Sequence, residues 1–137
     1  MPFEILEHTA EVGLRAEAPT LPALLADLGM GLFSLITDVQ TVRRVRTWDV
    51  EVASPDLPSV VVDWLNELLF LHARDGALAA EVCVHEVSPT HLHATLHGEP
   101  FDPQRHPRGI EVKAATYHQL RVDSVDGTWT AVVYLDI

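Results

Sequence analysis

The sequence predicts an α+β fold, a two-layer sandwich in which two main helices pack on one face of a mostly antiparallel or mixed β-sheet. Two stretches carry apolar residues at helical spacing, and shorter stretches with alternating apolar and polar residues lie between and around them. This order of elements differs from the regular strand–helix alternation of a parallel doubly wound fold. With 137 residues, 47% of them hydrophobic, residues 1–137 are expected to form a single domain.

The first half of the chain predicts two strands, a helix and a third strand. The strands are expected at 2–7 and 12–18, because apolar side chains alternate with other residues in the second stretch. Thr20 is suited to cap a helix whose leucine-rich stripe extends to about residue 37. Residues 45–53 alternate again and predict the third strand.

The second half predicts a longer helix followed by two strand pairs. The helix covers roughly 57–75 and ends before Gly76, a residue typical of helix C-caps. Strands at 79–87 and 91–97 form a hairpin, and the proline- and glycine-rich stretch 97–109 predicts a loop.

The last strand pair is expected at 110–122 and 128–136. Asp126-Gly127 between these strands suits a tight turn. The final strand is apolar on both faces, as in "TWTAVVYLDI", and this pattern is typical of a strand in the middle of a sheet.

The charge and composition of the chain exclude several classes of function. The chain has 20 acidic and 9 basic residues and a net charge of −11, so strong direct binding to nucleic acid is not expected. No apolar run has the length of a membrane helix, and the N-terminus lacks a secretory signal pattern. A single cysteine, Cys83, excludes an internal disulfide framework. These features predict a cytoplasmic protein without membrane contact.

The end of the sequence is a candidate metal site. Asp136 lies next to Ile137, so a side-chain carboxylate and the terminal oxygens are close together. Hard cations such as calcium bind oxygen ligands of this kind, and Glu11, between the first two strands, is a candidate third contributor. The alternative is that Asp136 is simply hydrated at the strand end and that Glu11 lies in an exposed turn.

Histidines and one lysine are further candidates. His91, His93 and His97 alternate along one strand, and they indicate either a metal site or, more often, a solvent-facing polar row. His8 either orients a carboxylate or is a hydrogen-bonded turn residue. Lys113, the only lysine, either contacts an anionic group or partner, or pairs with a nearby acid.

Several segments together resemble the archease family. They are "EHTAEVGLRAEA", "GLFSLITD", "VDWLNELLFL", "GEPFDPQRH", "GIEVKAATYHQLRV" and "AVVYLDI", which run from residue 7 to residue 137 in the order found in that family. The resemblance implies an α+β fold and a non-catalytic activator of an RtcB-type RNA ligase. Such a ligase seals RNA ends in tRNA splicing or RNA repair through a guanylylated histidine and manganese, and the activator promotes guanylylation and repeated turnover.

The resemblance also implies site residues. Glu11, Asp136 and Ile137 correspond to the metal site, with calcium expected and magnesium or manganese as alternatives. Lys113 and His8 are expected to engage the ligase. The family usually has aspartate where this chain has Glu11, and the extra methylene leaves the position of the metal open.

Two other functions remain open from the sequence. One is a metal-dependent enzyme acting on a phosphorylated small molecule or an RNA end. The sequence contains no glycine-rich phosphate loop, zinc-protease motif or serine elbow that would support it. The other is a chaperone-like interaction module.

Overall fold

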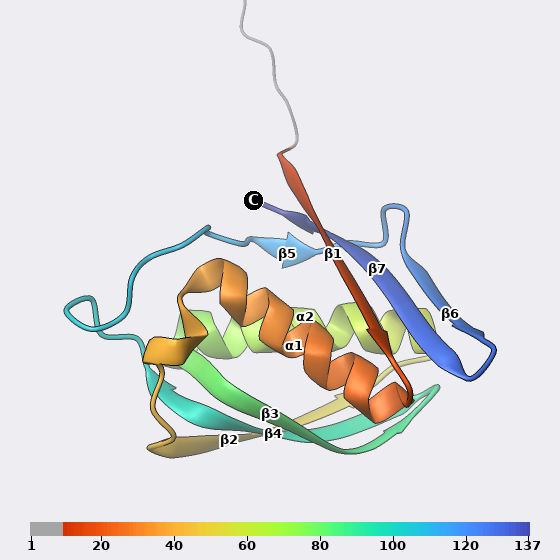
Figure 1. Cartoon of the computed structure of the whole chain (residues 1–137), viewed down its shortest axis with the longest axis horizontal. Helices are drawn as coiled ribbons and strands as arrows, with labels where there is room; N and C mark the ends of the chain where they lie inside the picture. The colour runs from red at the N-terminus through yellow and green to blue at the C-terminus, as the bar shows by residue number, and fades with distance from the viewer. Residues whose placement is uncertain (1–9) are drawn as a thin grey trace, which may run out of the picture.

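The computed structural model describes residues 10–137 (Figure 1). Its elements are β1 (Glu11–Ala18), α1 (Leu21–Ile36), the short 3-10 helix η1 (Val39–Thr41), β2 (Arg46–Ala53), α2 (Leu57–Asp75), β3 (Ala77–Ser88), β4 (His91–Pro100), β5 (Ala114–Ala115), β6 (Arg121–Val125) and β7 (Thr128–Asp136). The strand expected at residues 2–7 lies outside the described residues.

The described strands form two antiparallel sheets with the two helices between them. One sheet has the order β2-β4-β3, and in the other β7 pairs with β1, β5 and β6. Both helices contact strands of both sheets, and Figure 1 shows them running between the sheet with β7 and the sheet with β3. The α+β class with two main helices is therefore confirmed. The helices lie between two sheets, whereas the sequence predicts two layers with both helices on one face of a single sheet.

Both helices begin and end at residues with a local physical reason to be there. Thr20 Oγ1 accepts a hydrogen bond from the Ala23 N–H (3.2 Å) at the start of α1. Asp56 accepts one from the Ser59 N–H (2.9 Å) at the start of α2. Gly76 ends α2 in the left-handed conformation with φ 70°, which glycine adopts without strain. These caps bear out the two predicted helices.

The core lies between the helices and the inner faces of the sheets. Trp64 of α2 is fully buried, and its indole N–H donates to the Leu25 carbonyl of α1 (2.9 Å). This bond satisfies the polar group of the largest core side chain and joins the two helices. The other large, fully buried side chains are Phe33, Leu24, Leu25, Leu28, Leu32, Leu65, Leu68, Leu78, Leu92, Leu96 and Leu135.

The last strand is central, as predicted, because β1 pairs along one side and β5 and β6 pair along the other. The prediction of a continuous strand at 110–122 is wrong. Within this range only the two residues of β5 and the first two residues of β6, Arg121 and Val122, pair with β7, and the chain turns between them. Gln119 in this turn has φ 51°, a left-handed conformation that no extended strand contains.

The segment after β4 is anchored to α1. The hairpin strand β4 extends to Pro100, beyond the predicted start of the loop. The Gly109 N–H donates to the Ile36 carbonyl (2.8 Å), and the Ile110 N–H donates to the Leu35 carbonyl (2.7 Å). The loop thereby satisfies two carbonyls that the end of a helix leaves without partners. A Cβ atom at Gly109 would lie 2.2 Å from the Leu35 oxygen, so this approach requires glycine.

A buried carboxylate fixes the same loop to β4. Glu99 is 6% exposed and accepts hydrogen bonds from the Arg43 main-chain N–H (2.6 Å), the Arg105 guanidinium (2.7 Å) and His106 Nε2 (3.1 Å). His106 Nδ1 accepts from the Asp102 N–H, so the ring proton is on Nε2 and faces Glu99. Burial acts to raise the pKa of Glu99, but these hydrogen bonds and the Arg105 charge outweigh it and lower the pKa to about 2.

Candidate functional site

The end of β7 is held on both sides by main-chain hydrogen bonds. Glu11 and Asp136 are directly opposed in the antiparallel β1–β7 pair. The Ile137 N–H donates to the Ala10 carbonyl (3.1 Å), and the Lys113 N–H donates to the Asp136 carbonyl (2.8 Å). The last two residues are therefore fixed in the middle of the sheet and are flanked by chain on both sides.

Glu11 and Asp136 share one face of this sheet. Opposed residues of an antiparallel pair point to the same side, with Cβ atoms roughly 4.5–5.5 Å apart. That side is the outer one, because the next residue along β7, Leu135, is fully buried on the inner face. Ala114 of β5 is opposed to Asp136 on the other flank and adds only a methyl group to this face. The register thus brings together the two carboxylates that the sequence places at opposite ends of the chain.

The chemistry of these groups fits a hard cation. Two carboxylates on neighbouring strands repel each other unless a cation or hydrogen-bond donors compensate. Calcium prefers such oxygen ligands, and Glu11, Asp136 and the oxygens of Ile137 supply only these. Within residues 10–137, no three His, Cys, Asp or Glu side chains are grouped so that they could hold a metal ion. A cation here would therefore need main-chain or terminal oxygens and water as well as the two side chains.

His118 is a site residue that sequence reasoning missed. Its Nδ1 lies 2.9 Å from Glu11 Oε1, and its ring centroid lies 5.9 Å from that of Tyr134. The Tyr134 ring crosses β1 at Gly13, where a Cβ atom would approach it to 3.2 Å. His118 reaches this position because the chain turns at Gln119, which has a left-handed backbone conformation. Glutamine has no strong preference for this conformation, so the sequence does not predict the turn.

Lys113 lies beside the terminal site through its backbone, but its side chain lines a groove along α2. That groove is also lined by Asn66 and Phe70 of α2. Asn66 pairs with both main-chain groups of Ala115: Oδ1 accepts from the N–H (2.8 Å) and Nδ2 donates to the carbonyl (3.2 Å). The helix thus covers the edge of β5, whose outward main-chain groups would otherwise be open.

The other predicted histidines do not join this site. His8 lies outside the described residues. His91 Nε2 lies 3.7 Å from a Glu51 carboxylate oxygen, and His93 Nε2 lies 3.0 Å from one of Asp49, both across the β2–β4 pair. These contacts place His91 and His93 in a solvent-facing polar row on the sheet β2-β4-β3, which is one of the two alternatives that the sequence leaves open.

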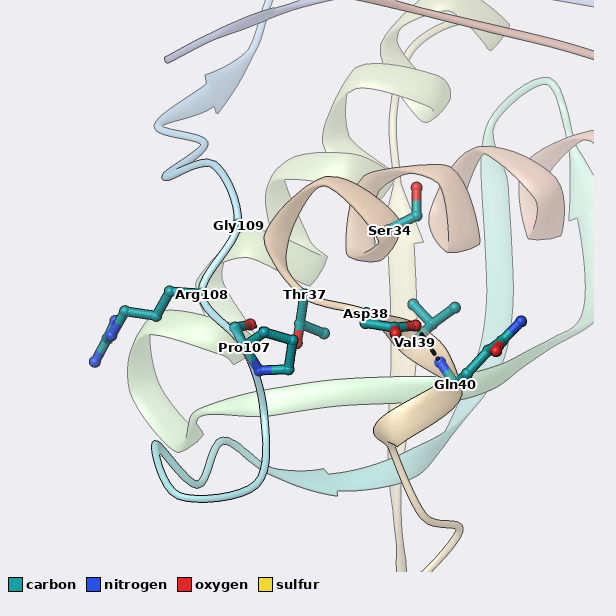
Figure 2. A pocket seen from close by; sticks show the side chains of 8 residues that line it. All are labelled: Ser34, Thr37, Asp38, Val39, Gln40, Pro107, Arg108 and Gly109. Carbon is teal, nitrogen blue, oxygen red and sulfur yellow. Dashed lines mark hydrogen bonds between the residues drawn. The ribbon is translucent and has the colours of Figure 1, made fainter.

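Figure 2 shows a further hollow, between the end of α1 and the anchored loop. The Asp38 carboxylate accepts a hydrogen bond from the Gln40 N–H (3.0 Å), and the Thr37 hydroxyl donates to the Pro107 carbonyl (2.8 Å). The Arg108 side chain points away from the other lining residues. The polar groups here serve the local turn and the loop anchor, so this hollow is not a candidate site.

Several known proteins are similar to this chain over nearly its whole length. The family model described as "Archease protein family" matches residues 3–137. "Protein archease" of Methanopyrus kandleri is 39% identical over 140 residues and covers 100% of both chains. "Protein archease" of Methanosarcina mazei is 34% identical over 139 residues, covering 98% of this chain and 95% of its own.

Solved structures extend the match to the fold. The solution structure of Methanobacterium thermoautotrophicum protein 1598 has a TM-score of 0.79 and 32% identity, with 96% of each chain covered. The crystal structure of an archease from Thermotoga maritima, described as a possible chaperone, has a TM-score of 0.66 and 15% identity over 98% of this chain and 97% of its own, and shows the fold alone. No helix in residues 10–137 is long and apolar enough to cross a membrane. With a family model and full-length relatives matching nearly every residue, the chain belongs to the archease family.

Proposed function

We propose that this protein is a non-catalytic activator of an RtcB-type RNA ligase, and that it promotes guanylylation of the ligase and its repeated turnover in tRNA splicing or RNA repair. Family membership over the whole chain is the observation that carries the proposal. The opposed carboxylates of Glu11 and Asp136 support it, because they lie where the resemblance expects the metal site.

In this proposal Glu11, Asp136 and the oxygens of Ile137 hold a calcium ion, with magnesium or manganese as alternatives. A divalent cation at this position would supply positive charge to phosphate oxygens during nucleotidyl transfer. The chain itself fixes the two carboxylates on one outer face and holds the strand end between β1 and the segment before β5. Glu11 is one methylene longer than the family's usual aspartate, and its contact with His118 Nδ1 limits where that longer side chain can lie.

The charge of the protein supports contact with the ligase more than contact with RNA. At a net charge of −11 it is repelled by a phosphate backbone and attracted to a cationic active site built to hold RNA and GTP. A protein partner is therefore proposed, without direct strong binding to nucleic acid. Lys113 and His8 are proposed to engage that partner.

The test is guanylylation of the cognate ligase by GTP, with this protein at a tenth of the ligase concentration. Accelerated modification that reaches completion is the expected result, since an activator that turns over need not be stoichiometric. Glu11→Ala and Asp136→Ala should abolish the effect. Glu17→Ala is the matched control, because Glu17 lies on the outer face of the same strand and pairs only with Arg15 among the described residues. Wild-type protein without effect, in the presence of manganese and calcium, would refute the proposal.

A chaperone-like module is the second candidate, because the Thermotoga maritima relative is described as a possible chaperone. That function needs an apolar contact surface and no metal. It predicts that Glu11→Ala and Asp136→Ala leave every effect on a partner intact, which is opposite to the activator's expected behaviour. Aggregation assays of the ligase with and without these variants separate the two.

A further inference from the structure

Two cations of this acidic protein have no carboxylate partner in the part of the chain that the structure describes. The sequence has nine Lys and Arg residues, all within residues 10–137. Arg108 and Lys113 form no ion pair with residues 10–137, whereas the other seven do: Arg15, Arg43, Arg44, Arg46, Arg74, Arg105 and Arg121. In a protein with 20 acidic residues, unpaired cations are unexpected unless they serve a contact outside the chain.

Both of these cations line the same groove, which has a volume of about 600 Å³ and runs along the C-terminal half of α2. Leu69, Phe70 and Val112 supply apolar surface in this groove. Phe70 is 51% exposed, and the Arg74 guanidinium carbon lies 5.3 Å from its ring centroid. Cationic and apolar groups, with one carboxylate from Glu111, therefore occur together in one concave surface. Arginine and aromatic side chains are enriched in protein–protein interfaces.

The wall of this groove is held in place before anything binds. Gly109 and Ile110 are hydrogen-bonded to the end of α1, and the Lys113 N–H is bonded to the Asp136 carbonyl. On the other side, Asn66 ties α2 to Ala115. Arg108 stacks on the Phe101 ring, with 4.5 Å between its guanidinium carbon and the ring centroid. Because this wall is already ordered, binding pays a smaller entropic cost for ordering the protein.

We propose that this groove binds an extended segment of the partner protein in which carboxylates flank an apolar side chain. The carboxylates would pair with Arg108 and Lys113, and the apolar side chain would pack on Phe70. The inference rests on the proposed function, since the partner is taken to be the RtcB-type ligase. A segment with one or two negative charges meets little long-range repulsion, whereas an RNA backbone would meet the full acidic charge of the protein. A phosphate group also offers no apolar surface that could pack against Leu69, Phe70 and Val112.

The test is the affinity of the cognate ligase for wild-type protein, for the double variant Arg108→Ala/Lys113→Ala and for Phe70→Ser, measured by calorimetry. The matched control is Arg15→Ala/Arg121→Ala, which removes the same charge. Arg15 and Arg121 are both opposed to Val132, so they lie on the outer face of the sheet that contains β7, which is the face opposite to α2. We expect the double variant and Phe70→Ser each to weaken binding roughly tenfold or more, because lost ion pairs and lost aromatic packing act directly on the dissociation rate. The control variant should bind nearly as wild type does.

The outcomes separate the groove from the proposed function. If the double variant and Phe70→Ser bind and activate the ligase as wild type does, the groove inference is overturned while the activator role stands. If wild type binds through the groove without accelerating guanylylation, the activator role is refuted and the groove inference stands. Wild type that does not bind the ligase at all refutes both.

If GTP or a 12-nucleotide RNA binds the isolated wild type and not the double variant, the groove is a phosphate site and the inference is wrong. Unchanged calcium binding by the double variant is expected, since its substitutions leave Glu11 and Asp136 in place.

Discussion

Glu99 gives the sharpest test of how the structure is stabilised. We expect Glu99→Gln to lower the free energy of unfolding at pH 7 by about 3 kcal/mol. The carboxyl pKa falls from 4.5 to about 2 in the folded protein, and each unit corresponds to about 1.4 kcal/mol of preference for the charged form. Removing one member of a buried charge network typically costs about 3–5 kcal/mol, which agrees with this figure. Glutamine keeps the shape of the side chain and removes the charge that Arg43 and Arg105 face.

The pH dependence has a definite sign. Because the pKa of Glu99 is lowered on folding, its contribution is fully present above its unfolded value of 4.5 and is lost as the pH falls through about 2. Urea unfolding of wild type and Glu99→Gln at pH 7 and pH 3 measures this. The gap between the two proteins should narrow at pH 3, because the wild-type carboxyl loses part of its advantage there. Glu17→Gln is the control and should change little, since Glu17 and Arg15 are both more than half exposed. Equal stabilities of wild type and Glu99→Gln at pH 7, or a gap that does not narrow, would refute this account of the buried network.

Three further predictions follow from individual contacts. Gly109→Ala should destabilise the protein by roughly 1–3 kcal/mol in thermal unfolding, because its Cβ would lie 2.2 Å from the Leu35 oxygen; an unchanged melting temperature would contradict the required glycine. Asn66→Ala should cost roughly 1–3 kcal/mol and speed hydrogen exchange at the Ala115 amide, and protection that persists would show that the edge is covered in another way. His118→Ala should weaken calcium binding about 10-fold or more with little change in melting temperature, since its side chain is 56% exposed and holds Glu11; equal affinity would remove it from the site.

The helices and the central last strand were predictable because their signals are local. Thr20 and Gly76 mark ends of helices through their own side chain or backbone freedom, and the structure uses both in this way. The apolar residues on both faces of β7 predict a central strand without reference to any other part of the chain. Such features need only neighbouring residues, and they survive folding unchanged.

The features that the sequence did not predict depend on residues far apart in the chain. The division into two sheets follows from which strands pair, and alternation alone does not choose partners. The break in the strand expected at 110–122 depends on the left-handed Gln119, a residue without strong turn preference. His118 could be identified as a site residue only from the structure, in which this turn places it beside Glu11. The resemblance named Glu11 and Asp136, and the β1–β7 register then placed them opposite each other.

The pairing of β1 with β7 has a consequence for the order in which the molecule assembles during synthesis. Every residue of the sheet β2-β4-β3 has been synthesised once the chain reaches residue 100, and its hairpin is built from neighbouring segments. The other sheet joins the first described strand to the last one, so its closure bears the larger entropic cost of a long loop. During synthesis Glu11 and Asp136 can therefore meet only after β7 has been made. A nascent or truncated chain would carry a formed hairpin sheet and no terminal site, which makes the presence of that site a report that the whole chain has folded.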